Sequence, residues 1–136
     1  MGIGATHIDH IVISTNDSAT VAQTFADNLG IEIKRKMIRP GTSAQLAFAK
    51  LDEVVLEFAG PPEVTPGQEV KAKLFGLVLA VQDIDAAAAH LRSLGHTVSE
   101  PKAAVQPGAK IATVKDGTNG VPFALIQYNA LPIEEN

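Results

Sequence analysis

Two side chains capable of acid–base chemistry lie inside apolar, β-branched stretches of this 136-residue chain. His10 lies in IDHIVIS, where strand alternation puts it on the face opposite Ile11 and Ile13. Glu57 lies in VVLEFA, where an ionised carboxylate is costly unless it is paired or hydrogen-bonded. A buried carboxylate is a candidate general base, and a histidine can be its partner. The alternatives are a hydrogen-bonded pocket histidine without a catalytic task, and a structural ion pair of Glu57 with His10 or a nearby arginine.

An internal repeat indicates which elements position these residues. Residues 8–33 and residues 74–98 share one order of features. Each has an apolar run, an acidic stop, an alanine-rich helical stretch, then Leu-Gly and a second extended run. Asp17 and Leu29-Gly30 in the first copy match Asp83 and Leu94-Gly95 in the second. Self-similarity of this length determines the architecture.

Each copy is predicted to form a βαβββ unit, with a linker rich in proline and glycine between the two. The first unit spans residues 8–59, the linker residues 60–72 and the second unit residues 73–128. The predicted strands are 8–14, 31–39, 44–50, 53–59, 74–81, 96–99, 109–115 and 121–128. The predicted helices begin at the caps Asp17 and Asp83 and end at Gly30 and Gly95.

The helices of such units cover only one face of each sheet. The other face must then be covered by the second unit or by a partner chain. Curved sheets that face each other leave a cleft. We therefore predict a single α+β domain over residues 1–136, in which tandem βαβββ units form curved sheets around a cleft.

The composition argues against several classes of protein. The chain has no cysteine, which excludes disulfides, thiolate metal sites and a cysteine nucleophile, and fits a cytoplasmic protein. Its net charge is −4 and only 4% of its residues are aromatic, which argues against nucleic-acid binding. No apolar run approaches the ~18–20 residues of a membrane span. We therefore expect a protein that binds a small molecule, without a nucleic-acid or membrane partner.

The tandem units, together with the motifs DHIVIST, NLGIEI, VVLEF and DGTNGVPFALIQ, resemble the vicinal oxygen chelate superfamily. That group includes glyoxalase I, methylmalonyl-CoA epimerase, extradiol dioxygenases, and the fosfomycin and bleomycin resistance proteins. The resemblance covers residues 8–128 and implies a glyoxalase-like fold and a homodimer. It leaves the reaction open, because one scaffold carries several chemistries.

The resemblance also implies metal ligands on the first and last strands of each unit. The first unit holds His10 and Glu57 at these positions, whereas the second holds Gly76 and Ala124, which supply no side-chain donor. A catalytic divalent ion takes at least three protein ligands. We therefore expect either no cofactor or a divalent metal ion held weakly by His10 and Glu57.

The two small replacements suggest room for an organic ligand. We expect the ligand pocket to be lined by Val12, Val55, Gly76, Val78, Ala124 and Ile126. The leading hypothesis is a lyase- or isomerase-type enzyme in which Glu57 is the general base and His10 its partner or an electrophilic acid. The alternatives are a metal-free binding protein of the resistance type and a diverged paralogue with a vestigial cleft. One of the cations at 34–36 and 39 could meet an anionic substrate.

Overall fold

The computed structural model describes residues 2–129. The chain divides into two compact units, of which the first is residues 10–75. The second combines residues 2–9 with residues 76–129. The predicted domain limits, 1 and 136, lie outside the described residues. No helix among the described residues is long and apolar enough to cross a membrane.

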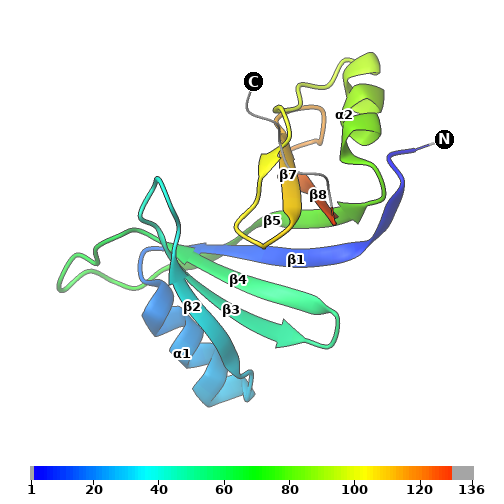
Figure 1. Cartoon of the computed structure of the whole chain (residues 1–136). Coiled ribbons are helices and arrows are strands. Elements are labelled where there is room, and N and C mark those ends of the chain that lie inside the picture. The colour runs from blue at the N-terminus through cyan, green and yellow to red at the C-terminus, as the bar shows by residue number, and fades with distance from the viewer. Residues whose placement is uncertain (1, 130–136) are drawn as a thin grey trace. The chain divides into compact units, whose positions relative to one another are not determined.

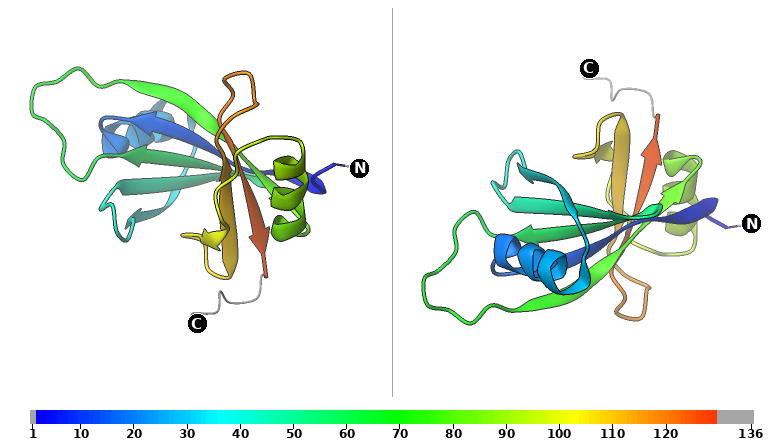
Figure 2. Two further views of the ribbon diagram at one scale, coloured as in Figure 1. Left: turned by 90° about the horizontal axis from the view of Figure 1, so that it is seen from above. Right: turned by 90° about the horizontal axis from the view of Figure 1, so that it is seen from below.

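The first unit is a four-stranded sheet with one helix against it (Figures 1 and 2). Its strands lie in the order β2-β3-β4-β1, with β1 parallel to β4 and the other pairs antiparallel. The strand β1 begins in the second unit and enters the first. The elements are β1 (Ala5–Thr15), α1 (Ser18–Leu29), β2 (Ile33–Ile38), β3 (Gln45–Leu51) and β4 (Val54–Gly60).

Local signals set the ends of α1 as predicted. The carboxylate of Asp17 accepts a hydrogen bond from the Thr20 backbone N–H at 3.1 Å, which satisfies one free donor of the first turn. Gly30 follows the helix at φ 69°, a left-handed conformation that favours glycine. The helix packs on the sheet through a core that includes Val21, Ala22 and the fully buried Phe58. This core fixes which face of the sheet is turned away from α1.

The second unit repeats the same order of elements. Its strands lie in the order β5-β8-β7-β6, with β5 parallel to β8 and the other pairs antiparallel. The buried face of α2 packs on Val81, Ala112 and Leu125. The elements are β5 (Ala72–Val81), α2 (Ile84–Ser93), β6 (Lys102–Ala103), β7 (Ala109–Val114) and β8 (Phe123–Tyr128). The predicted α+β class and the repeated βαβββ order are confirmed.

The predicted strand 96–99 is wrong, because only an isolated bridge between Val98 and Val114 forms there. The Arg92 guanidinium donates to the carbonyl oxygens of Val98 and Ser99 at 3.0 and 3.1 Å. The Thr113 N–H donates to the Ser99 hydroxyl at 2.8 Å, and the Ser99 N–H donates to the Thr113 carbonyl at 2.9 Å. The backbone pairing at 96–99 is therefore limited to this short contact with β7, and the short β6 forms further along the chain.

The N-cap of α2 allows a direct test of whether capping by an aspartate side chain stabilises this protein. Asp83 accepts from the Ala86 N–H at 3.0 Å. Replacing Asp83 with Ala should lower the free energy of unfolding by about 1 kcal/mol, whereas Asp83→Asn should stay close to wild type. Chemical denaturation followed by circular dichroism measures both values. Equal stability of the Ala and Asn variants would show that the cap contributes nothing.

Candidate active site

The register of the first sheet aligns the candidate residues on the face turned away from α1. Glu57 on β4 pairs with Phe48 on β3 and with Val12 on β1. His10 pairs with Val55, one position along the same face from Glu57 by strand alternation. The two acid–base candidates are therefore diagonal neighbours on adjacent strands, as alternation predicted for His10.

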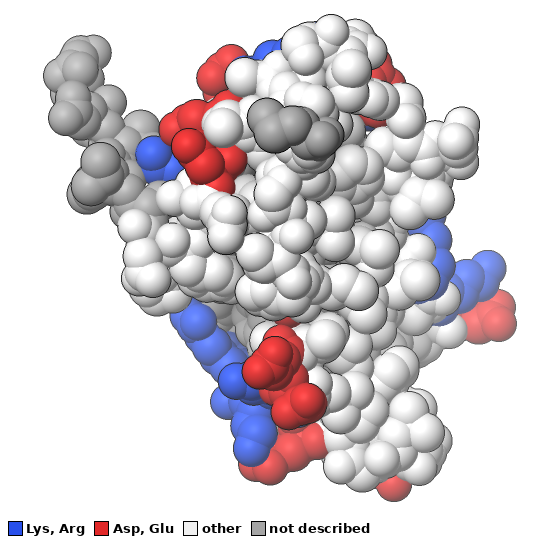
Figure 3. All heavy atoms as spheres, turned by 90° about the vertical axis from the view of Figure 1, so that its right-hand side faces the viewer, with Lys and Arg blue, Asp and Glu red and all other residues white. Residues whose placement is uncertain are grey.

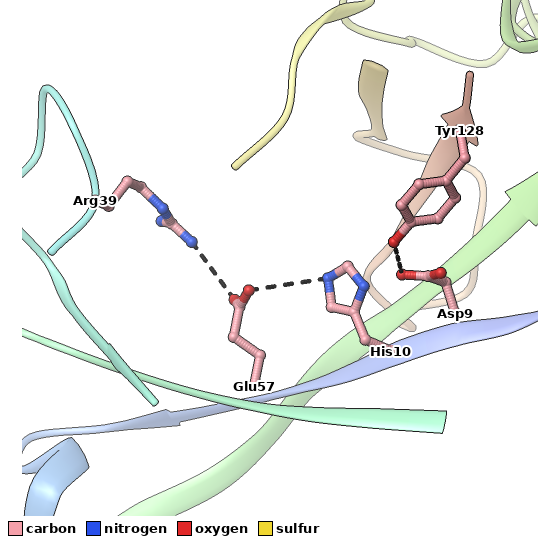
Figure 4. A network of polar contacts seen from close by, with 5 residues as sticks. All are labelled: Asp9, His10, Arg39, Glu57 and Tyr128. Atoms are coloured by element: carbon pink, nitrogen blue, oxygen red, sulfur yellow. Dashed lines mark hydrogen bonds and ion pairs between the residues drawn. The ribbon is translucent and has the colours of Figure 1, made fainter. Parts of the chain in front are cut away.

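The side chains of His10, Glu57 and Arg39 form one polar cluster, which we call the Glu57 cluster (Figure 4). His10 and Glu57 are only 3% and 4% exposed. The His10 Nε2 lies 4.0 Å from Glu57 Oε1, and Arg39 Nη2 lies 3.5 Å from Glu57 Oε2. Each carboxylate oxygen thus has its own neighbour. The arginine supplies the positive charge that a buried carboxylate requires.

Arg39 reaches the cluster from the hairpin that joins β2 to β3. Its backbone N–H donates to the Ala44 carbonyl at 2.8 Å, and its own carbonyl accepts from the Ser43 N–H at 3.0 Å. The turn contains Gly41 at φ 88° and Ser43 at φ 60°. The hairpin therefore holds the Arg39 backbone in place while the guanidinium extends back along the sheet.

The environment of Glu57 on this face is largely apolar. Val12 and Val55, both expected in the ligand pocket, are half-buried, and Phe48 and Leu46 on β3 are buried. A carboxylate among such groups has few water molecules to stabilise its charge, so the cluster residues carry that task. This arrangement would suit Glu57 as a proton acceptor for a C–H group of an apolar part of a substrate.

In the second unit, Val78, Ala124 and Ile126 lie on the face turned away from α2. Val78 is 4% exposed and Ile126 fully buried, and Ala124 is half-buried. The pair Val78–Ala124 occupies the register position that Val12–Glu57 occupies in the first unit. The structure thus supports the equivalence of Ala124 with Glu57.

Gly76 differs from the expectation that its small size leaves room for a ligand. A Cβ atom built there would lie 2.5 Å from the carbonyl oxygen of Pro122 and 3.1 Å from its carbonyl carbon. That carbonyl also accepts a hydrogen bond from the Leu77 N–H at 3.2 Å. The main chain of Pro122 therefore fills the space, and Gly76 permits close packing of two backbone segments rather than ligand entry.

The side chains present do not fit a catalytic divalent ion. His10 and Glu57 are two donors, and the guanidinium of Arg39 lies beside the carboxylate where a second cation would be repelled. No group of three or more His, Cys, Asp or Glu side chains suited to a metal occurs among residues 2–129. A catalytic ion takes at least three protein ligands.

The pairing of Asp9 and Tyr128 was missed by the sequence reasoning. The Tyr128 hydroxyl donates to Asp9 Oδ2 at 2.9 Å, and both residues belong to the second unit (Figure 4). Partial burial of the phenol, followed by its hydrogen bond to Asp9, raises the pKa of Tyr128 above its ordinary value of 10. Tyr128 lies on the same strand face as Ala124 and Ile126, which was the available signal.

One cavity in the first unit is lined by residues of α1, β2 and β3 and by none of the Glu57 cluster. It has a volume of about 450 Å³ and is open on the α1 side of the sheet, between α1, β2 and β3. Its lining includes Ser18, Lys36, Ile38 and Gln45.

Charged groups of both signs form small, separate clusters on the face drawn in Figure 3.

The repeated βαβββ units and a Glu–His pair at a strand-borne site define a glyoxalase-like protein. Residues 7–125 match the family described as the Glyoxalase/Bleomycin resistance protein/Dioxygenase superfamily. The chain is also 30% identical over 130 residues to "Uncharacterized protein YaeR" of Escherichia coli (strain K12), covering 92% of this chain and 98% of that protein. The chain therefore belongs to the Glyoxalase/Bleomycin resistance protein/Dioxygenase superfamily.

Solved structures with this fold include two methylmalonyl-CoA epimerases. A variant of the Streptomyces coelicolor enzyme in complex with 2-nitronate-propionyl-CoA has a TM-score of 0.77 and 22% identity, covering 93% of this chain and 99% of its own. The Mycobacterium tuberculosis enzyme has a TM-score of 0.74 and 18% identity, covering 92% and 89%. The predicted glyoxalase-like fold is thus confirmed.

Proposed function

We propose that this protein is an isomerase or lyase that removes a proton from the carbon next to a carbonyl group of a small molecule. Glu57 is the base, and His10 is the group that stabilises the developing negative charge. The observation that carries the proposal is the buried Glu57 carboxylate with the His10 ring 4.0 Å away on the same face of the sheet. Membership of a superfamily that binds small molecules supports this choice.

The proposed step conserves protons and electrons. A Glu57 oxygen takes the α-proton, and the electron pair of the C–H bond forms the enolate, whose oxygen accepts a hydrogen bond from the His10 ring. Return of the proton to the opposite face of the α-carbon, or to a different carbon, gives an isomer, and loss of a leaving group from the enolate gives a lyase product. A positioned base contributes about 10²–10⁴-fold to the rate of such a reaction.

The first substrate class to test is an acyl thioester. The Streptomyces coelicolor epimerase was solved with 2-nitronate-propionyl-CoA. Thioester carbonyls acidify the neighbouring carbon, which suits a carboxylate base. We therefore propose acyl-CoA compounds as candidate substrates, with simple 2-oxo acids as the comparison set.

The test is exchange of the α-proton in D₂O, followed by proton NMR. Propionyl-CoA, methylmalonyl-CoA and pyruvate are incubated with the protein and without it. We expect the protein to accelerate loss of the α-proton signal from at least one compound. A compound that binds and raises the melting temperature without any exchange would contradict the enzyme proposal.

That contrary result would favour a metal-free binding protein. One observation supports this alternative: both oxygens of Glu57 have side-chain neighbours, His10 on one and Arg39 on the other. Such a pair can be purely structural.

The homodimer and the cytoplasmic location expected from the sequence stay predictions. Light scattering on a sizing column measures whether the protein is a dimer.

A further inference from the structure

We propose that Arg39 recognises a negatively charged group of the substrate, a carboxylate or a phosphate, and that this group takes the guanidinium from Glu57. The inference rests on the proposed function, because it names the substrate class for the same site. Arg39 is then the specificity-determining residue, and Glu57 is released as a base only when an anionic substrate binds.

The exposure of the two partners is unequal. The Arg39 side chain is 36% exposed, whereas that of Glu57 is 5% exposed. Solvent and solutes therefore reach the guanidinium from outside, while the carboxylate lies beneath it. An anion that approaches the Glu57 cluster meets Arg39 first.

The contact between the two is loose enough to exchange. It joins a single guanidinium nitrogen, Nη2, to Glu57 Oε2 at 3.5 Å, which is long for a charge-assisted hydrogen bond of about 2.7–2.9 Å. A free carboxylate can instead take two parallel N–H groups of the guanidinium fork. An incoming anion thus offers Arg39 a better geometry than Glu57 does.

The exchange requires movement of one side chain only. The Arg39 backbone stays bonded to Ala44 and Ser43 at the end of the hairpin. The turn residues Gly41 and Thr42 are exposed, so the side chain has solvent on its outer side. Rotation of the arginine toward solvent leaves the hydrogen bonds between strands unchanged.

Loss of the guanidinium alters the chemistry of Glu57. The guanidinium then no longer lies beside Glu57 Oε2, so this carboxylate oxygen can approach the α-proton of the substrate. The two contacts of Arg39 are coupled reciprocally: binding of the anion weakens the contact with Glu57, and the contact with Glu57 weakens binding of the anion. Glu57 and the substrate anion are therefore competitors for one cation.

The test uses malonate and inorganic phosphate as probes, with malonamide as an uncharged compound of the same shape as malonate. Calorimetric titration at about 0.15 M ionic strength should detect binding of malonate or phosphate, or both, and none of malonamide. Arg39→Gln should weaken anion binding at least about tenfold. Arg35→Gln is the matched control, because Arg35 lies on the same strand face over Phe48 rather than Glu57. It should change binding by less than about twofold, since Arg35 is exposed and an exposed charge outside the contact contributes little.

Two further variants separate recognition from folding. Glu57→Gln removes the negative charge that competes for Arg39 and should tighten malonate binding by about two- to fivefold. The double variant Arg39→Gln, Glu57→Gln leaves no buried unpaired charge, so it should fold and still fail to bind malonate. Equal binding of malonate and malonamide, or malonate binding unchanged by Arg39→Gln, would overturn the inference.

The role of Arg39 and the catalytic role of Glu57 can be rejected separately. Loss of malonate binding in Arg39→Gln without α-proton exchange in any assay would support anion recognition and reject the enzyme. Exchange that depends on Glu57, together with anion binding that ignores Arg39, would support the enzyme and reject the role of Arg39.

Discussion

The Glu57→Gln variant should lose α-proton exchange by about 10²–10⁴-fold while it keeps its fold. Glutamine has nearly the shape of glutamate, so packing against Val12 and Phe48 is preserved. The amide oxygen can still accept from Arg39, which lies 3.5 Å from Glu57 Oε2 in the native protein. The amide cannot accept a proton from carbon, which is the only property that the proposed mechanism requires of this residue.

The experiment compares initial exchange rates by proton NMR on the substrate that the wild-type protein selects. Glu53→Gln is the matched control, because Glu53 is an exposed glutamate in the turn that precedes β4. It should exchange at the wild-type rate. Melting temperatures within a few degrees of wild type would confirm that neither variant has lost its structure. Exchange at an undiminished rate in Glu57→Gln would exclude Glu57 as the base.

The helix α1 was correctly predicted because the residues that begin and end it are all present in the local sequence. For α1, the cap Asp17 and the stop Gly30 lie within the segment that they bound, so no tertiary information is needed. At 96–99 only the bridge between Val98 and Val114 forms, and Arg92 donates to the Val98 and Ser99 carbonyls. Nothing in the extended run itself indicates that an arginine of the preceding helix will occupy those acceptors.

In the candidate site too, some features follow from the local sequence and others depend on tertiary contacts. Alternation along β1 placed His10 on the face away from Ile11 and Ile13, and the register of β1 with β4 brings it to Glu57. The sequence did not distinguish Arg39 from the cations at 34–36, because the hairpin geometry decides which one reaches Glu57. Asp9 and Tyr128 are 119 residues apart, so their hydrogen bond follows only from the folded chain.

Gly76 also shows where sequence comparison reaches its limit. Comparison of the two units indicated a position without a side-chain donor. It could not indicate why glycine is there, since the Pro122 carbonyl that excludes a side chain lies on a distant segment. The absence of a side chain at position 76 and the close approach of the backbone are linked, because a larger residue requires the Pro122 segment to move.

Gly76→Ala should therefore lower the free energy of unfolding by about 1–3 kcal/mol, as overpacking does in well-packed regions. The added Cβ would lie 2.5 Å from a backbone oxygen, which cannot rotate away as a flexible side chain can. Two other glycines without a left-handed backbone provide a graded comparison. A Cβ at Gly60 would lie 3.0 Å from the Ser18 nitrogen, and one at Gly2 would have no neighbour within 4 Å.

Urea denaturation of the three alanine variants should rank the loss of stability as Gly76, then Gly60, then Gly2, with Gly2→Ala equal to wild type. The ranking follows from the distance between the added Cβ and its nearest heavy atom at each site, since repulsion rises steeply as atoms approach. A Gly76→Ala protein as stable as Gly2→Ala would show that the Pro122 segment yields without cost. In that case a larger side chain at position 76 would be sterically tolerated, and the packing explanation for the glycine there would fail.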